Sequence, residues 1–191
     1  MKTTVYFAKT NPNAIIPSKR NEDAGLDIYA CFAEEYILIA PHETKLIPTG
    51  IASVCDKDYC FILKERGSTG TKGIAQRCGI IDSGYRNEWF VPITNTSDKW
   101  LVICKESMTE DKLKDAVWQV REKFKKVQHF EIQCYPYEKA ITQALVIPVP
   151  QTEVIELTYD ELKAISSERG DGALGSSGKW KQFWILLFQR G

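Results

Sequence analysis

The chain reads YILIAPHETKLIPTGIASVCDKDYCFIL from Tyr36 to Leu63. Short apolar runs in this stretch end at Pro41, at Pro48 and before the turn Asp56–Asp58. Runs of the same kind recur at Trp89–Ile93, Trp100–Ile103, Phe130–Cys134 and Ile141–Val149. Strands of this length, with frequent Pro, Gly, Asn and Asp breaks, are typical of an antiparallel sandwich or jelly roll. We therefore predict an all-β fold of this class.

Length and composition narrow the possible functions. The 191 residues suit one domain, or one domain carrying an insertion. The 25 Lys and Arg balance the 25 Asp and Glu, so the chain lacks the basic field that non-specific nucleic-acid binding needs. The apolar run near the C-terminus that includes Trp184–Phe188 is far too short to cross a membrane, and the N-terminus lacks a signal-peptide core. We expect a cytoplasmic protein that binds neither membrane nor nucleic acid.

The cysteines and histidines favour neither disulfides nor a zinc site. Six cysteines stand at positions 31, 55, 60, 78, 104 and 134, and none forms a CxxC pair. Without a secretion signal, reduced and mostly buried thiols are expected. His42 and His129 lie outside any metal-ligand spacing, so no protein-held zinc is expected.

Two segments depart from the strand pattern. In the first, Ser107 to Gln128, apolar residues recur every three or four positions, which predicts an amphipathic helix capped by Ser107 and Glu110. Its apolar stripe consists of Leu113, Ala116, Val117, Val120, Phe124 and Val127. In the second, Thr158 and Glu161 form another capping box. We expect one β-domain over residues 1–157 with a helical insertion at about 104–129, followed by a short helix and C-terminal arm over 158–191.

Three polar stretches carry possible chemistry. Arg66–Gly73 combines two cations, small hydroxyl residues and glycines, which suits an oligophosphate and is equally typical of a solvated turn. Ser167–Lys179 repeats this composition, and a flexible linker has it too. In Gly79–Arg86, Asp82 follows an apolar pair at the mouth of a turn. A carboxylate there either stabilises the turn or acts as a general base.

Together with two more stretches, these segments resemble the five ordered motifs of the homotrimeric dUTPases, which hydrolyse dUTP to dUMP and pyrophosphate. Gly79–Arg86 is a near-complete match to the family's third motif, G-x-I-D-x-x-Y-R. The others are Ala24–Ile28, Arg66–Ile74, Ala140–Leu145 and Arg169–Gly178. The resemblance implies a distorted jelly roll, of the dUTPase-like β-clip type, assembled as a homotrimer.

The resemblance also implies a role for individual residues. Asp82 would deprotonate the water that attacks the α-phosphorus, and Tyr85 would pack on the deoxyribose and leave no room for a 2′-hydroxyl. The hairpin backbone at Gly79 and Ile81 would read the uracil. The phosphate-binding set would be Arg66, Gly67, Ser68, Thr69, Gly70, Lys72 and Gln143, and the arm of a neighbouring subunit would close over the ligand with Arg169, Leu174, Gly175, Ser176 and Ser177.

Other roles implied by the resemblance lie outside direct substrate contact. Asp27 and Arg86 would be structural residues near the site. Mg²⁺ would be held by the triphosphate and water, with no protein ligand.

Some positions depart from the family pattern. Gly67 replaces a serine, Asn87 a glycine, and Leu174 the phenylalanine that stacks on the base. Ala140 replaces an arginine, which removes a structural ion-pair partner. The long insertion is similar to inserts in some phage-encoded members.

Two alternatives remain at this point. One is a dCTP deaminase-type activity on the same fold. The other is a regulatory role, in which residues 107–128 bind a protein partner.

Overall fold

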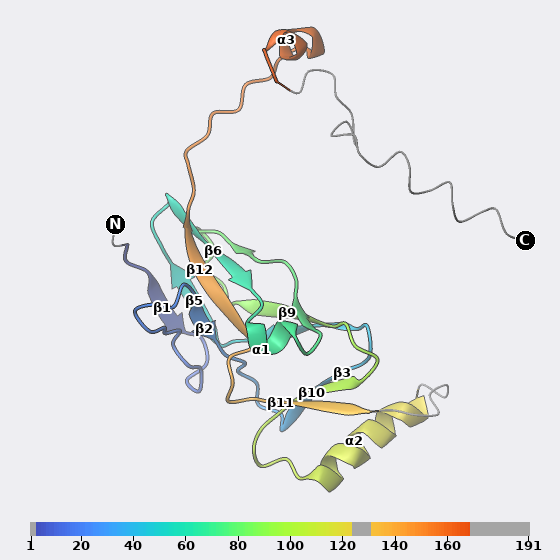
Figure 1. Ribbon diagram of the computed structural model, residues 1–191. Coiled ribbons are helices and arrows are strands. Elements are labelled where there is room, and N and C mark those ends of the chain that lie inside the picture. Colours follow the sequence, from blue (N-terminus) through green and yellow to red (C-terminus); the bar gives the residue numbers. More distant parts are fainter. Residues whose placement is uncertain (1–2, 124–130, 169–191) are drawn as a thin grey trace, which may run out of the picture. The chain divides into compact units, whose positions relative to one another are not determined.

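A computed structural model of the protein describes residues 3–123 and 131–168. These residues form two compact units that divide between Gln151 and Thr152. The first unit is built of short strands (Figure 1). They are β1 (Tyr6–Lys9), β2 (Leu26–Ile28), β3 (Tyr36–Ile39), β4 (Thr44–Pro48), β5 (Ile51–Val54), β6 (Tyr59–Lys64), β7 (Ile74–Gln76), β8 (Ile80–Ile81), β9 (Phe90–Asn95), β10 (Trp100–Cys104), β11 (Ile132–Pro136) and β12 (Thr142–Pro148). The all-β prediction is confirmed.

The strands pair into small sheets, ordered β1-β5, β11-β10-β3, β2-β12-β6-β8 and β4-β9-β7. An aromatic cluster lies at the centre of the unit, where the fully buried Trp89 makes edge contacts with Phe61 at 4.9 Å and with Phe7 at 5.5 Å between ring centroids. Such contacts add to the stabilisation that apolar burial gives. This core fixes β6 and β9, and the segments that follow or precede these strands carry most of the motif residues.

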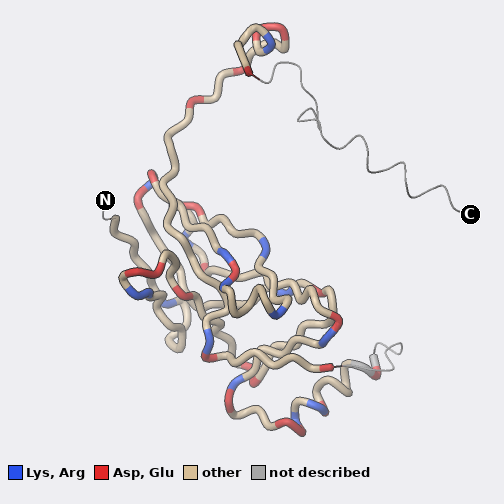
Figure 2. Tube along the Cα trace, in the orientation of Figure 1, with Lys and Arg blue, Asp and Glu red and all other residues tan. Residues whose placement is uncertain are grey.

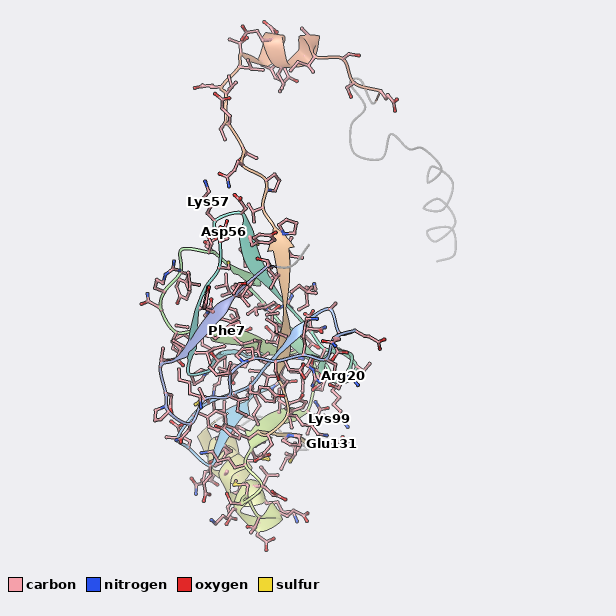
Figure 3. All side chains as sticks on the ribbon, turned by 90° about the vertical axis from the view of Figure 1, so that its left-hand side faces the viewer. Phe7, Arg20, Asp56, Lys57, Lys99 and Glu131 are labelled. Carbon is pink, nitrogen blue, oxygen red and sulfur yellow. The ribbon has the colours of Figure 1, made fainter. Side chains whose placement is uncertain are left out.

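One pair of strands contradicts the expected antiparallel arrangement. β10 and β11 run parallel, with Trp100 opposite Ile132 and Val102 opposite Cys134. Figure 3 labels Lys99 and Glu131, which precede the two strands and form an ion pair of 2.6 Å. Parallel neighbours need a crossover, and α2 (Glu110–Lys123) supplies it. The elements β10, α2 and β11 therefore form a β-α-β unit.

The apolar stripe of α2 packs against its own chain. Leu113 and Val117 form a second core with Leu38, Trp100 and Val102 on one face of the β11-β10-β3 sheet. The helix begins later than the capping pattern predicts, because Thr109, and not Ser107, accepts the first helical bond, from the Leu113 amide at 3.0 Å. The predicted stripe residues Phe124 and Val127 lie outside the described residues.

All six cysteines are free, as the sequence predicts, but they are less buried than expected. Cys31 and Cys55 are buried, whereas Cys78 and Cys134 are exposed. Burial, reinforced by the neighbouring Cys134, raises the pKa of the Cys104 thiol to about 11. This thiol is therefore protonated at neutral pH and a poor nucleophile.

The second unit begins at Thr152, a few residues before the expected boundary. Its helix α3 (Tyr159–Ala164) has the predicted capping box, in which the Glu161 amide donates to Thr158 Oγ1 at 3.3 Å and the Thr158 amide donates to Glu161 Oε2 at 2.8 Å. All described side chains of this unit are exposed.

The packing of α2 leads to a stability prediction. Leu113→Ala should lower the free energy of unfolding by about 2–5 kcal/mol, because it opens a cavity between the helix and the sheet. Gln119→Ala, on the exposed face of the same helix, should change it by less than about 0.5 kcal/mol. Urea denaturation of both variants checks this, and equal small effects would show that the helix does not stabilise the sheet.

Candidate active site

Two hollows in the surface contain residues of the motifs. The larger has a volume of about 890 Å³ and lies where the loop before β2, the start of β12 and the helical turn α1 (Gly67–Gly70) meet. It is lined by Ser18, Lys19, Arg20, Glu22, Asp23, Ala24, Gly25, Asp27, Arg66, Gly67, Ser68 and Gln143. Residues of the first, second and fourth motifs thus share one cavity, which we call the loop hollow. Its wall from Ser18 to Asp23 was not predicted, because a polar run before a strand has the composition of an ordinary turn.

An ion pair holds the wall of the loop hollow together. Arg66 Nε lies 3.0 Å from Asp27 Oδ1, and Arg66 Nη2 donates to Asp27 Oδ2 at 3.3 Å. Arg66 Nη1 also donates to the Ala140 carbonyl at 3.2 Å. With alanine at position 140, the arginine of the fourth motif is absent from this wall. Arg66 pairs with Asp27 instead, so this arginine links the loop Arg66–Gly73, which we call the polar loop, to both β2 and the segment before β12.

Gln143 is fixed in the same wall. It lies opposite Asp27 on β2 and Lys64 on β6, and its amide nitrogen donates to the Glu65 carbonyl at 2.9 Å. A Cβ at Gly25 would come within 2.8 Å of Gln143 Oε1, so only glycine fits there without displacing the amide. The close approach explains why a glycine follows Ala24 in the first motif.

The structure divides the predicted phosphate-binding residues. Gly67 and Ser68 line the loop hollow and are exposed. Thr69 is fully buried, and its hydroxyl accepts from the Arg66 amide at 3.0 Å and donates to the Arg66 carbonyl at 2.9 Å. Its side chain therefore shapes the turn and is closed to a ligand, which corrects its predicted role. Gly70 and Lys72 lie outside the lining, and Lys72 Nζ sits 5.8 Å from the centre of the Tyr135 ring.

A second, smaller hollow of about 180 Å³ contains the third motif. It is lined by Ile80, Ile81, Asp82, Tyr85 and Phe90, and we call it the hairpin hollow. The Asp82 side chain is exposed, and the Tyr85 amide donates to the Asp82 carbonyl at 3.0 Å. Gly79 passes close to β6, because a Cβ there would lie 2.7 Å from the Leu63 carbonyl oxygen. Arg86 donates to the Ser83 carbonyl within this turn.

The two hollows lie at different places along β6. Ile81 pairs with Phe61, whereas the polar loop leaves the strand after Lys64. The strand between Phe61 and Lys64 alone is about 10 Å long, and Asp82 continues away from the loop. Asp82 and Ser68 of one chain are therefore too far apart to act on adjacent phosphates of one nucleotide.

Some expectations fall outside what the structure describes. Arg169, Leu174, Gly175, Ser176 and Ser177 of the fifth motif lie beyond residue 168. Within residues 3–123 and 131–168, no three His, Cys, Asp or Glu side chains gather as a metal-binding group. In the same residues, no helix has the length and apolar character needed to span a bilayer.

The half-buried ion pair should matter more than its exposed neighbour. Arg20, labelled in Figure 3, and Asp23 also form a double contact, of 2.9 and 3.0 Å. The Arg20 side chain is 89% exposed, against 30% for Arg66. Asp27→Asn should cost about 1–2 kcal/mol of stability, because it leaves the guanidinium without its charge partner. Asp23→Asn should cost clearly less, because water and salt screen an exposed pair. Thermal denaturation of the two variants tests the difference, and equal losses would contradict it.

Comparison with known proteins places this geometry in a family. A model of the dUTPase family matches residues 11–107. The deoxyuridine 5′-triphosphate nucleotidohydrolase of Nautilia profundicola is 31% identical over 175 residues, covering 90% of this chain and 96% of that protein. The dUTPase of Staphylococcus bacteriophage 80alpha, solved with dUpNHpp, has a TM-score of 0.65 at 22% identity and covers 92% of this chain and 99% of its own. A phage phi11 dUTPase, described with a structural Mg(II) ion, has a TM-score of 0.59 at 18% identity and covers 83% and 99%. With the family model matching half of its length and a curated relative matching nearly all of it, the chain belongs to the dUTPase family.

Proposed function

We propose that the protein hydrolyses dUTP to dUMP and pyrophosphate, and so limits the uracil that enters DNA. The observation that carries this proposal is the pair of hollows in a chain of this family. One presents glycines, a hydroxyl and a fixed amide, as a triphosphate requires, and the other presents an exposed carboxylate beside an aromatic ring. Family membership favours dUTP over the dCTP of the deaminase alternative.

The reaction assigns one step to Asp82. A water oxygen bonds to the α-phosphorus, the bond from that phosphorus to the oxygen bridging it to the β-phosphorus breaks, and pyrophosphate leaves. Asp82 takes the proton from the water, since its exposed carboxylate is open to both solvent and ligand. The Gly67 and Ser68 turn and the Gln143 amide orient the leaving phosphates. Lys72 and Gly70 contact them only if the ligand extends beyond the loop hollow.

The charges of the loop hollow suit a phosphate that arrives with a cation. Its three cations, Lys19, Arg20 and Arg66, are matched by three carboxylates, Glu22, Asp23 and Asp27. Basic and acidic residues are interspersed along the first unit (Figure 2). A bare triphosphate gains little net attraction from such a wall. A Mg²⁺ ion held by the triphosphate and water would neutralise phosphate charge, and Arg169 of the arm would add a further cation.

We also propose that the active site forms between subunits of a homotrimer. The separation of the two hollows along β6 supports this, because a second copy must bring its hairpin to the loop. An outward apolar face on β4 and β9 supports it as well. Leu46 is 63% exposed and Phe90 44% exposed, and the two lie on the same face with Pro48 and Pro92. Such a face is typical of an interface between copies.

A regulatory role through residues 107–128 has weaker support. The apolar stripe of α2 is already buried in its own chain, so a partner would have to use the outer face. Trp118, which is 54% exposed, is the feature there that favours a partner. A pull-down comparing the wild type with Trp118→Ala tests this alternative.

Asp82→Asn tests the chemical step. The amide keeps the shape of the carboxylate but cannot accept the proton, so turnover of dUTP should fall at least about 10²-fold. Affinity for the non-hydrolysable dUpNHpp should stay within about threefold. Asp98→Asn, another exposed aspartate, should hydrolyse dUTP as the wild type does. Pyrophosphate release from dUTP, dCTP, dTTP and UTP measures this, and an active Asp82→Asn would exclude Asp82 as the base.

Subunit mixing tests the shared site. Ser68→Asp places a negative charge against the phosphates, and Asp82→Asn removes the base, so each homotrimer should be nearly inactive. If each site takes its loop from one chain and its hairpin from another, random trimers assembled from equal amounts should regain about a quarter of the wild-type rate. No recovery in trimers shown by native mass spectrometry to contain both variants would mean that each chain builds its own site.

A further inference from the structure

Glu88 has no role in the site described so far, yet its side chain is tied to a distant part of the chain. It follows the third motif and is half-buried. Its Oε1 accepts the Gly50 amide at 2.8 Å, at the turn between β4 and β5. A side chain that reaches across the fold to bind a main-chain amide fixes the position of its own backbone.

The Gly50 turn is a rigid anchor for this contact. Gly50 has a φ of +66°, and a Cβ there would lie 2.9 Å from Asn11, Ala14 and Cys31. Its carbonyl also accepts the amides of Thr10 at 2.8 Å and Asn11 at 3.2 Å. Only glycine adopts this conformation in this space without strain, so the turn has little freedom to shift.

The backbone of Glu88 in turn holds Tyr85. The Tyr85 hydroxyl donates to the Glu88 carbonyl at 3.0 Å. The backbone of Tyr85 is held as well, because its amide donates to the Asp82 carbonyl at 3.0 Å. The ring is 38% exposed and lines the hairpin hollow, so it is fixed at both ends with one face open.

The next residue strengthens the anchor. Thr49 Oγ1 donates to the Trp89 carbonyl at 2.7 Å, and the Trp89 amide donates to the Ile51 carbonyl at 2.8 Å. Because Trp89 is fully buried, these bonds keep the strand in place when the Glu88 side chain is removed. Loss of the carboxylate should therefore leave the fold intact. It removes the side-chain tie of Glu88 to Gly50, so the segment from Tyr85 to Glu88 that precedes the Trp89 peptide gains freedom.

We propose that Glu88 is a positioning residue that sets the preference for deoxyribose over ribose by holding Tyr85 in place. This inference rests on the proposed function, in which the Tyr85 ring fills the space of a 2′-hydroxyl. The ring excludes ribose only while its distance from the sugar is fixed, and the link from Gly50 through Glu88 fixes it. A tyrosine that can retreat admits the extra hydroxyl.

The test compares the ratio of kcat/KM for dUTP to kcat/KM for UTP in three variants of Glu88. Glu88→Ala should lower this ratio about 2- to 10-fold. The KM for dUTP should rise, and kcat/KM should fall less for UTP than for dUTP. Glu88→Asp keeps the charge but is one methylene too short to reach Gly50, and should lower the ratio as well. Glu88→Gln keeps an oxygen acceptor at the same reach and should retain the wild-type ratio within about twofold.

Two controls separate positioning from general destabilisation. Glu43→Ala removes a glutamate that likewise accepts a main-chain amide, that of Ala40 at 2.7 Å, but lies away from the hairpin. It should lower the melting temperature without changing the ratio. In a Tyr85→Phe background, which already lacks the hydroxyl bond to Glu88, adding Glu88→Ala should change the ratio by less than about twofold, because coupled residues are not additive.

The outcomes are distinct. An unchanged ratio in folded Glu88→Ala and Glu88→Asp overturns the inference and leaves dUTP hydrolysis standing. A loss of equal size in the Tyr85→Phe background overturns it too, since Glu88 would then act by another route. A wild-type protein that does not prefer dUTP to UTP overturns the proposed function and this inference together.

Discussion

The pairing of β6 on both of its edges determines where the functional residues lie. One edge is bonded to β12, which brings Gln143 opposite Lys64, and the other is bonded to β8, which brings Ile81 opposite Phe61. The loop that begins at Arg66 follows the end of β6. The hairpin that carries Asp82 pairs with Phe61 and Ile62, nearer the middle of the strand. Because the strand is rigid and packed on the aromatic core, the distance between loop and hairpin is fixed within one chain. This constraint separates the two hollows and is the physical basis of the proposed site between subunits.

Electrostatics in the loop hollow follow from the same arrangement. With alanine at position 140, the carboxylate of Asp27 takes the arginine of the polar loop as its partner. The loop is thereby joined to β2 and to the entry of β12, so the ion pair acts as a brace of the cavity. The cation that holds the wall is then less free to bind phosphate, and the positive charge for the substrate has to come from elsewhere.

Local patterns in the sequence predicted what depends on neighbouring residues. Short strands, the Thr158 and Glu161 cap and the inward stripe of α2 all follow from period and capping rules that act over a few positions. The parallel pairing of β10 and β11 was missed, because strand direction depends on partners more than twenty residues apart. The resemblance put Thr69 among the phosphate-binding residues, and a motif match does not reveal that its hydroxyl bonds back to Arg66. The wall from Ser18 to Asp23 was missed for a similar reason, since only the fold shows that this turn faces the loop of Arg66.

The crossover through α2 also limits how this protein can change in length. Cys104 ends one parallel strand and Ile132 begins its neighbour at the opposite end, so the connection must travel back along the whole strand. A tight turn cannot make that path. Shortening the segment to a hairpin would force β11 to reverse its direction and would change its register. Tyr135 would then lose the position from which its hydroxyl donates to the Ala140 carbonyl. Evolution or engineering can therefore lengthen this connection, or graft another domain into it, far more readily than either can remove it.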